Sequence, residues 1–206
     1  MKIAQLELFK VPPRWLFIKL TTENGIEGWG EPVVEGKADT VKAAVEEMGE
    51  YIIGKDARNI EDIWQMLYRG GFYRGGAILM SAISGIDQAL WDIKGKALGV
   101  PVYQLLGGAV RDKMKVYGWI GGDKSVNVVQ GALQRLKEGF KAVQMNACSS
   151  MEWIDSPQKI QNAISCIEGV RNARGYDIGL GVDFHGRVHK GMAKGFMKDL
   201  ECLKPM

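Results

Sequence analysis

The segment Gly181–Val188, GVDFHGRV, places a carboxylate and an imidazole two residues apart, Asp183 and His185, directly after a short apolar run. Side chains alternate along a strand, so we expect Asp183 and His185 to point to the same side. Aspartate is a hard oxygen ligand suited to Mg²⁺, and histidine can act as an acid or base near neutral pH. The alternative is that Asp183 caps the following helix and His185 is hydrogen-bonded at the surface.

Several other polar residues are candidates for contact with a ligand. Asn146 ends the run KAVQMN, where its amide either hydrogen-bonds a substrate hydroxyl or forms a turn. Tyr73 and Arg74 lie in GFYRGGAI between two glycine pairs, which indicates a mobile loop that carries a cation; a plain interhelical connection is the competing interpretation. Glu31 and Glu35, in WGEPVVEG, face either a ligand or water.

Other candidate groups favour structural roles. His189 follows His185 by four residues, but no carboxylate stands nearby at a ligand spacing, so we expect a solvent-facing side chain near a helix start. Asp87 and Asp92 differ by five positions in a helical pattern, which puts them on different faces and favours surface or capping roles. The three cysteines are too few and too scattered for a disulfide framework or a zinc site, so we expect reduced packing thiols.

The second half of the chain predicts the elements that position Asn146 and Asp183. Strand-like and helical segments alternate, in the order 116–120, 126–139, 141–146, 157–175, 177–184 and 192–204. Three such units predict parallel strands with right-handed crossovers, and ligands bind at the carboxyl ends of such strands. An open doubly wound sheet is an alternative, but the turn IGGDKS lacks the GxGxxG spacing that binds a pyrophosphate.

The first half predicts a different architecture. Segments 2–11 and 15–22 are typical of strands, and Asn24-Gly25 favours a tight hairpin with two positive φ angles. Helical patterns follow over 38–54, with Asp39 as a possible cap, over 59–71 and over 78–97, and PVYQLLGG makes a short further turn. We therefore expect an α+β domain over residues 1–112 and part of a (β/α) barrel over residues 113–206.

Composition excludes several classes of function. The chain has 206 residues, of which 46% are hydrophobic and 25% charged, and a formal net charge of +3. This is typical of a globular protein, and no basic run with interleaved aromatics predicts nucleic-acid binding. No apolar stretch approaches the ~20 residues that span a bilayer, and the amino terminus lacks the apolar core of a secretory signal. We therefore expect no membrane partner and a cytoplasmic location.

Several longer stretches of the sequence resemble those of a known protein family. The predicted antiparallel strands at the start of the chain, the string FYRGGAILMSAISGIDQALWDIKGK and the strand end GVDFHGRV resemble the mandelate racemase-like branch of the enolase superfamily. The resemblance implies a capping domain over a modified barrel, in which carboxylates on the third, fourth and fifth strands bind Mg²⁺. Asp183 matches the first ligand. In the sugar-acid dehydratases of this branch a base removes the proton beside the substrate carboxylate and an acid helps to expel the 3-hydroxyl; His185 matches that acid.

The sequence departs from the family pattern in two ways. Gln144 stands where relatives often place a lysine on the second strand, so His185 carries the acid role alone. Only three βα units follow residue 112, so the remaining metal ligands and the histidine base of the family are not among these residues. We therefore expect an incomplete barrel and little activity from this chain alone; a non-catalytic remnant is the alternative. Family members form homo-oligomers, and the sequence leaves the oligomeric state of this chain open.

Overall fold

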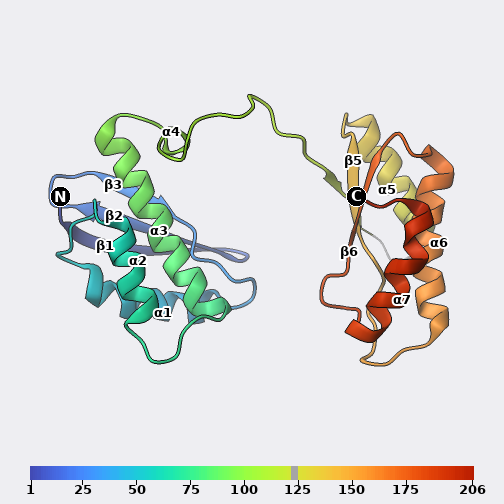
Figure 1. The fold of residues 1–206 in the computed structure, drawn as a ribbon, viewed down its shortest axis with the longest axis horizontal. Helices are drawn as coiled ribbons and strands as arrows, with labels where there is room; N and C mark the ends of the chain where they lie inside the picture. The colour runs from blue at the N-terminus through green and yellow to red at the C-terminus, as the bar shows by residue number, and fades with distance from the viewer. Residues whose placement is uncertain (122–124) are drawn as a thin grey trace. The chain divides into compact units, whose positions relative to one another are not determined.

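The computed structural model describes residues 1–121 and 125–206, and the chain divides into two compact units, Met1–Val110 and Arg111–Met206 (Figure 1). Residues 122–124, part of the turn IGGDKS, lie outside the described residues. The prediction that this turn does not bind a pyrophosphate therefore stays a prediction. An antiparallel sheet with helices comes first, and a parallel sheet with helices follows. The predicted fold class, an α+β unit followed by an incomplete (β/α) barrel, is confirmed.

The N-terminal unit is built on a three-stranded antiparallel sheet, β1 (Ile3–Val11), β2 (Trp15–Thr22) and β3 (Glu27–Gly30). Strand β2 alternates strictly, and its inward side chains are fully buried: Leu16, Ile18 and Leu20. The β2–β3 hairpin differs from the prediction. Only Gly25 has a positive φ, of 80°, and its N–H donates to the Thr22 carbonyl at 2.9 Å. The Thr22 N–H donates to the Ile26 carbonyl oxygen at 3.0 Å, so residues 23–25 form a three-residue loop, which needs one left-handed glycine.

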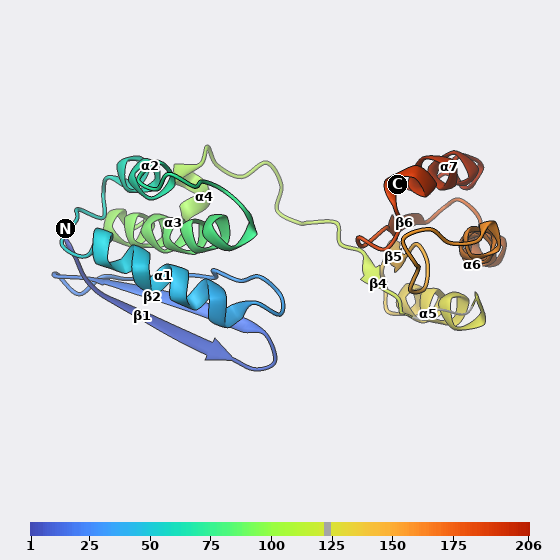
Figure 2. The same cartoon turned by 90° about the horizontal axis from the view of Figure 1, so that it is seen from below.

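Four helices complete this unit, α1 (Ala38–Ile52), α2 (Ile60–Arg69), α3 (Ala77–Leu98) and α4 (Val102–Leu105). Figure 2 shows helices covering one face of the sheet. The predicted cap at Asp39 is wrong, because the helix begins one residue earlier and the capping position is Lys37. The Asp39 carboxylate instead pairs with Lys10, whose Nζ lies 2.6 Å from Oδ1.

Strand β3 lies directly on the backbone of α3. A Cβ added to Gly28 would lie 2.1 Å from the Ala89 carbonyl oxygen, and one added to Gly30 would lie 2.0 Å from that of Gly85. Both distances are far below contact, so only glycine fits at these positions. Asp92 joins the same two elements, because its Oδ2 accepts a hydrogen bond of 2.9 Å from the Trp29 N–H. The expected surface or capping role of Asp92 is therefore replaced by a tether between helix and strand.

The C-terminal unit contains a parallel sheet in the order β4 (Gly118–Trp119), β5 (Ala142–Asn146) and β6 (Gly179–Asp183). Three α-helices, α5 (Ser125–Lys137), α6 (Pro157–Arg174) and α7 (Lys190–Leu200), cover one face, and a short 3-10 helix, η1 (Glu201–Leu203), follows (Figure 1). The apolar strand residues on that face are buried in a core with the helices, namely Val143, Met145 and Leu180. Gln144, Asn146 and Asp183 alternate with them and therefore belong to the opposite face.

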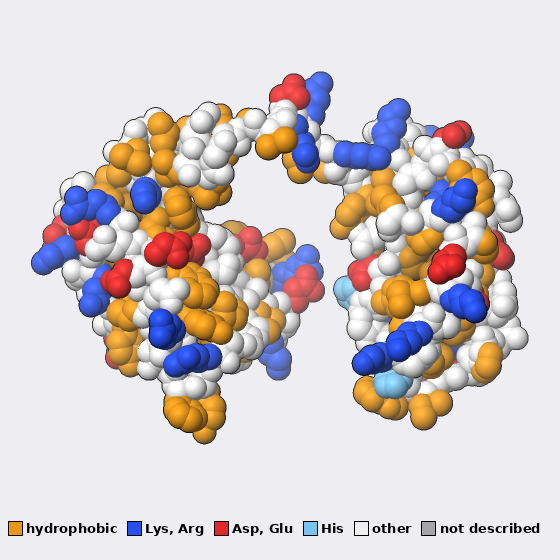
Figure 3. Space-filling view, viewed as in Figure 1, with side chains coloured by type: hydrophobic (Ala, Val, Ile, Leu, Met, Phe, Trp, Pro, Cys, Tyr) orange, Lys and Arg blue, Asp and Glu red, His pale blue; other side chains and the backbone are white. Residues whose placement is uncertain are grey.

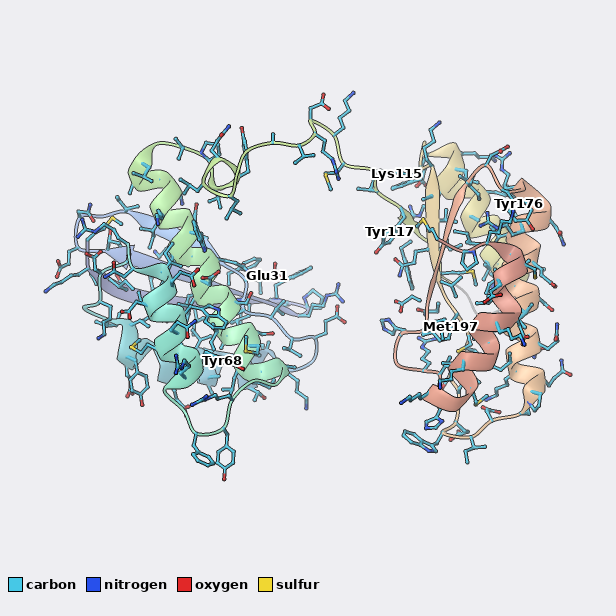
Figure 4. The ribbon with its side chains drawn as sticks, viewed as in Figure 1. Glu31, Tyr68, Lys115, Tyr117, Tyr176 and Met197 are labelled. Carbon is cyan, nitrogen blue, oxygen red and sulfur yellow. The ribbon has the colours of Figure 1, made fainter. Side chains whose placement is uncertain are left out.

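Arg171 ties the end of α6 to the segment after α7. Its guanidinium donates to the carbonyl oxygens of Leu203 at 2.7 Å, Lys204 at 2.7 Å and Ile178 at 3.0 Å. The residue is only 5% exposed, and this burial lowers the pKa of the guanidinium. Its guanidinium carbon, Cζ, lies 5.0 Å from the centre of the Tyr176 ring, which Figure 4 labels beside α6.

Among the described residues, no helix is both long and apolar enough to cross a membrane.

Candidate active site

The carboxyl ends of β5 and β6 bring two of the predicted site residues side by side. The parallel register pairs Asn146 with Asp183, the last residues of their strands. The next residue, Ala147, donates its N–H to the Asp183 carbonyl oxygen at 2.7 Å, which extends the ladder beyond the strands. Two neighbouring strands with buried apolar neighbours therefore fix the positions of an amide and a carboxylate at one edge of the sheet.

Asp183 and His185 are in direct contact. The Asp183 carboxylate accepts a hydrogen bond of 2.7 Å from the His185 backbone N–H through Oδ1, and its Oδ2 lies 3.0 Å from His185 Nδ1. The predicted reason for this proximity, strand alternation, is wrong. The strand ends at Asp183, and His185 has a left-handed φ of 47°. An aspartate that accepts from the N–H two residues on forms a local turn, and this turn folds the imidazole back onto the carboxylate.

The contact stabilises the ionised form of Asp183. The hydrogen bond from the His185 side chain, and then that from its backbone N–H, hold the pKa of the Asp183 carboxyl below its ordinary value, and the positive charge of Arg187 acts in the same direction. The carboxylate is therefore ionised at neutral pH. His185 is 60% exposed at its side chain, so the ring nitrogen that faces away from Asp183 is accessible to a ligand.

The side chains at this edge of the sheet include oxygen donors suited to Mg²⁺. Asp183 supplies an anionic oxygen, and the Oδ1 atom of Asn146 is buried without a hydrogen-bond partner among the described residues. Both are hard oxygen donors of the kind Mg²⁺ takes. Within residues 1–121 and 125–206, however, no group of three or more His, Cys, Asp and Glu side chains lies together to hold a metal. These residues fit one part of a magnesium site.

The histidine at position 189 has a structural role. Its Nδ1 accepts a hydrogen bond of 3.3 Å from the Gly191 N–H, so His189, and not Asp183, caps α7. The ring also packs on Trp153, with 4.4 Å between ring centroids. The predicted position near a helix start is correct, but the side chain is half-buried against an aromatic ring instead of facing solvent.

Sequence reasoning missed a groove beside the Asp183–His185 pair. It has a volume of about 560 Å³ and lies between residues 150–153, after β5, and residues 186–190, after β6. Arg187 and Trp153 line it. The signal for Arg187 was present in GVDFHGRV, where it follows His185 by two positions. Trp153 stands in an irregular segment, and no pattern in the sequence indicated its position.

Tyr73 and Arg74 lie in the N-terminal unit, in the loop between α2 and α3. Tyr73 is 86% exposed, and the neighbouring Phe72 is 91% exposed, on a loop that projects from the unit (Figures 1 and 3). The Arg74 guanidinium donates to carbonyl oxygens of its own loop, at 3.3 Å to Gly71 and 3.4 Å to Arg69. Both predicted residues line an apolar pocket of about 260 Å³ within this unit.

The two predicted glutamates also belong to the N-terminal unit. Glu31 follows β3, and its backbone N–H donates to Gln88 Oε1 on α3 at 2.9 Å (Figure 4). The Glu35 carboxylate accepts a hydrogen bond from Arg14. Both contacts are compatible with a ligand-facing or a water-facing side chain, so the two interpretations of each glutamate stay predictions.

Comparison with known proteins supports this architecture. Residues 12–107 match the model of the mandelate racemase / muconate lactonizing enzyme N-terminal domain. The match lies within the N-terminal unit, Met1–Val110. The chain is also 55% identical over all of its 206 residues to the D-galactonate dehydratases of Pectobacterium atrosepticum and Variovorax paradoxus. It spans 54% of the length of each of these relatives, their N-terminal part.

Solved structures extend the likeness to both units. A putative dehydratase from Zymomonas mobilis superposes with a TM-score of 0.91 at 30% identity, over 99% of this chain and 60% of that one. An enolase from Pantoea ananatis with bound D-gluconate and magnesium gives a TM-score of 0.88 at 27% identity, over 99% and 58%. The predicted resemblance to the mandelate racemase-like branch of the enolase superfamily, and within it to the N-terminal part of D-galactonate dehydratase, is confirmed.

Proposed function

We propose that this chain carries the Asp183–His185 half of the active site of an acid-sugar dehydratase that converts D-galactonate to 2-keto-3-deoxygalactonate. The observation that supports the proposal is the contact between Asp183 and His185 beside Asn146, in a chain 55% identical to D-galactonate dehydratases. A relative by structure binds D-gluconate and magnesium, an acid sugar and the metal that this chemistry needs.

The reaction places different demands on the residues. A base removes the proton from C2, the electron pair of that C–H bond forms the C2–C3 double bond, and the bond between C3 and its hydroxyl oxygen breaks. The resulting enol then tautomerises to the 2-keto-3-deoxy acid. A hydroxide ion leaves poorly, so a positioned acid that protonates the departing oxygen accelerates the step. When bound, Mg²⁺ would neutralise the negative charge that develops on the substrate carboxylate.

In this proposal His185 is that acid. Its Nδ1 faces Asp183 Oδ2 at 3.0 Å, which leaves Nε2 as the ring nitrogen that donates to a substrate hydroxyl. The contact with Asp183 Oδ2 orients the ring, so that Nε2 faces away from the carboxylate. In this assignment Asp183 also offers oxygen to the metal and Asn146 accepts or donates at a substrate hydroxyl. The base at C2 belongs to a later part of the barrel, as the resemblance implies.

The role of Tyr73 and Arg74 in this proposal is to contact substrate from the N-terminal unit. Arg74 keeps part of its guanidinium free of the two loop carbonyls that it binds, and Tyr73 is exposed. An arginine and a tyrosine hydroxyl are suitable donors for the hydroxyl and carboxylate oxygens of a sugar acid.

The test uses this chain supplied with the remaining half of the Pectobacterium atrosepticum relative, assayed for the 2-keto-3-deoxy acid from D-galactonate with Mg²⁺. We expect His185→Asn to lower kcat by about 10²–10⁴-fold, because a general acid contributes that much. The matched control, His189→Asn, makes the same substitution and keeps a side chain that can cap α7, so it should leave kcat within a few-fold. Turnover that persists in a chelator, or that His185→Asn leaves unchanged, would contradict the proposal.

A further inference from the structure

The two walls of the groove beside the Asp183–His185 pair contact each other at two points, and these contacts fix the shape of the groove. Arg187 Nη1, from the wall after β6, donates to the Cys148 carbonyl oxygen at 3.0 Å, at the base of the wall after β5. At the outer end the rings of Trp153 and His189 pack against each other with an interplanar angle of 48°. Two cross-contacts therefore fix both walls, and the groove of about 560 Å³ is preformed.

The lining combines an aromatic face with hydrogen-bond donors. Trp153 is 75% exposed although one side of its ring packs on His189. The Nε and Nη2 donors of Arg187 have no hydrogen-bond acceptor among the described residues, and the exposed Lys190 ammonium has no partner among them either. An apolar ring beside N–H donors suits a carbon chain that carries hydroxyl groups, because the C–H groups pack on the ring and the oxygens accept from the donors.

The groove begins one residue after the proposed acid. Gly186 is part of its lining, and His185 precedes it in the turn that contacts Asp183. In the proposed reaction the substrate carboxylate, C2 and C3 occupy the Asp183–His185 end, so C4, C5 and C6 of a six-carbon acid must extend elsewhere. We propose that the groove between residues 150–153 and 186–190 binds this hydroxylated C4–C6 tail and so selects the length of the acid sugar. This inference rests on the proposed function.

The test compares acid sugars of two lengths. Dissociation constants for D-galactonate and for a four-carbon aldonate are measured on the 206-residue chain in Mg²⁺ by NMR, with the Trp153 indole N–H as reporter. We expect D-galactonate to bind about ten-fold more tightly, because only the longer acid reaches Trp153 and Lys190. Trp153→Ala and Lys190→Gln should each weaken D-galactonate by about five-fold or more and leave the four-carbon acid unchanged. Arg187 is kept, because its bond to Cys148 holds the walls together.

Two matched controls separate tail binding from general effects. Lys194→Gln removes the same charge one turn further along α7, and Ile154→Ala shortens an exposed apolar residue that does not line the groove. Neither should change either constant. Equal affinity for the two acids, no detectable D-galactonate binding at millimolar concentration, or a loss in Lys194→Gln equal to that in Lys190→Gln would each overturn the inference.

The measurement distinguishes this inference from the proposed reaction because it requires no turnover. A length preference that depends on Trp153, in a protein whose completed barrel eliminates no water, would reject the reaction and keep the groove. Elimination without a length preference would reject the groove and keep the reaction. In the completed enzyme Trp153→Ala should raise KM for D-galactonate and leave kcat nearly unchanged, since the tail is bound equally in ground and transition states.

Discussion

The two units join their sheets to their helices in different ways. In the N-terminal unit, β3 meets α3 backbone against backbone, because Gly28 and Gly30 place no side chain between the strand and the helix. In the C-terminal unit, large side chains such as Phe196 and Ile167 fill the space between sheet and helices, and a buried arginine ties the chain after α7. Glycines therefore determine the packing of strand on helix in the N-terminal unit, and large apolar side chains determine it in the C-terminal unit.

The difference also separates the candidate functional residues. Asn146 and Asp183 end two hydrogen-bonded strands, where the backbone fixes their direction. Tyr73 and Arg74 stand on a projecting loop with left-handed glycines at Gly75 and Gly76, with φ of 78° and 80°. Groups that must hold a metal or move a proton need the first kind of support, whereas groups that select a substrate tolerate the second.

The largest effect is expected where β3 touches α3. In Gly30→Ala the new Cβ would lie 2.0 Å from the Gly85 carbonyl oxygen, and neither backbone can move without breaking the helix or the sheet. We expect a loss of about 3 kcal/mol or more in the free energy of unfolding of the N-terminal unit, measured by urea denaturation.

The same substitution in the C-terminal unit sharpens the contrast. Gly195 lies inside α7, is exposed, and has no atom within 4 Å of an added Cβ. Gly195→Ala should therefore stabilise the C-terminal unit by about 0.5–1 kcal/mol, because alanine favours the helix. Equal changes in the two variants, or a stable Gly30→Ala protein, would show that β3 and α3 do not approach as closely as described.

The next largest effect is expected at Arg171. Arg171→Met leaves the buried carbonyl oxygens of Leu203 and Ile178 without their donor, and an unsatisfied buried acceptor costs about 1–3 kcal/mol. We expect the C-terminal unit to lose about 2–4 kcal/mol in urea denaturation followed by circular dichroism. The control Arg174→Met, at an exposed position on the same helix, should change stability by less than about 0.5 kcal/mol. Similar losses in both variants would mean that Arg171 acts only through its charge.

The smallest effect compares a carboxylate from each unit. The side-chain hydrogen bond from Lys159, followed by the backbone N–H groups of Glu152 and Ser156, lowers the pKa of Asp155 to about 2. Asp56 in the N-terminal unit also has a lowered pKa, chiefly through Arg58. Since the folded pKa of Asp155 lies below its unfolded value, its contribution to stability is present above about pH 4 and is lost as the pH falls toward 2.

NMR titration of the carboxyl carbons tests this assignment. Lys159→Met should raise the pKa of Asp155 toward its ordinary value and leave that of Asp56 lowered, because the two carboxylates have separate partners. The acid midpoint of the C-terminal unit should move to higher pH in the same variant. An unshifted Asp155 would show that the backbone donors alone hold its charge.

Sequence periodicity was sufficient for most of the architecture. The alternation in WLFIKLTT predicted β2, and the repeated strand and helix patterns after residue 112 predicted the parallel sheet that brings Asn146 beside Asp183. Side-chain polarity reports burial, and burial follows the period of each element. The domain assignment, the roles of the site residues and the cytoplasmic location stay predictions.

Features that depend on tertiary contact or on single backbone angles were not predictable. The left-handed turn at His185 replaces an expected continuation of β6, because the Asp183 side chain captures the His185 N–H. The close approach at Gly30 involves a residue of α3 more than fifty positions away. The groove wall at Trp153 has no periodicity to reveal it. Each of these features depends on a contact between two particular residues, and the periodicity of a sequence does not reveal such contacts.

The bonds between β3 and α3 have a consequence for how the N-terminal unit opens. Besides the Asp92 tether, Lys96 donates to the Glu27 carbonyl oxygen at 2.8 Å, so a helix and a four-residue edge strand share polar contacts along their length. An edge strand this short would ordinarily fray and exchange its amide protons quickly. Here the Trp29 amide should exchange with deuterium more slowly than the amide of a free edge strand, since the Asp92 carboxylate on α3 accepts its hydrogen bond.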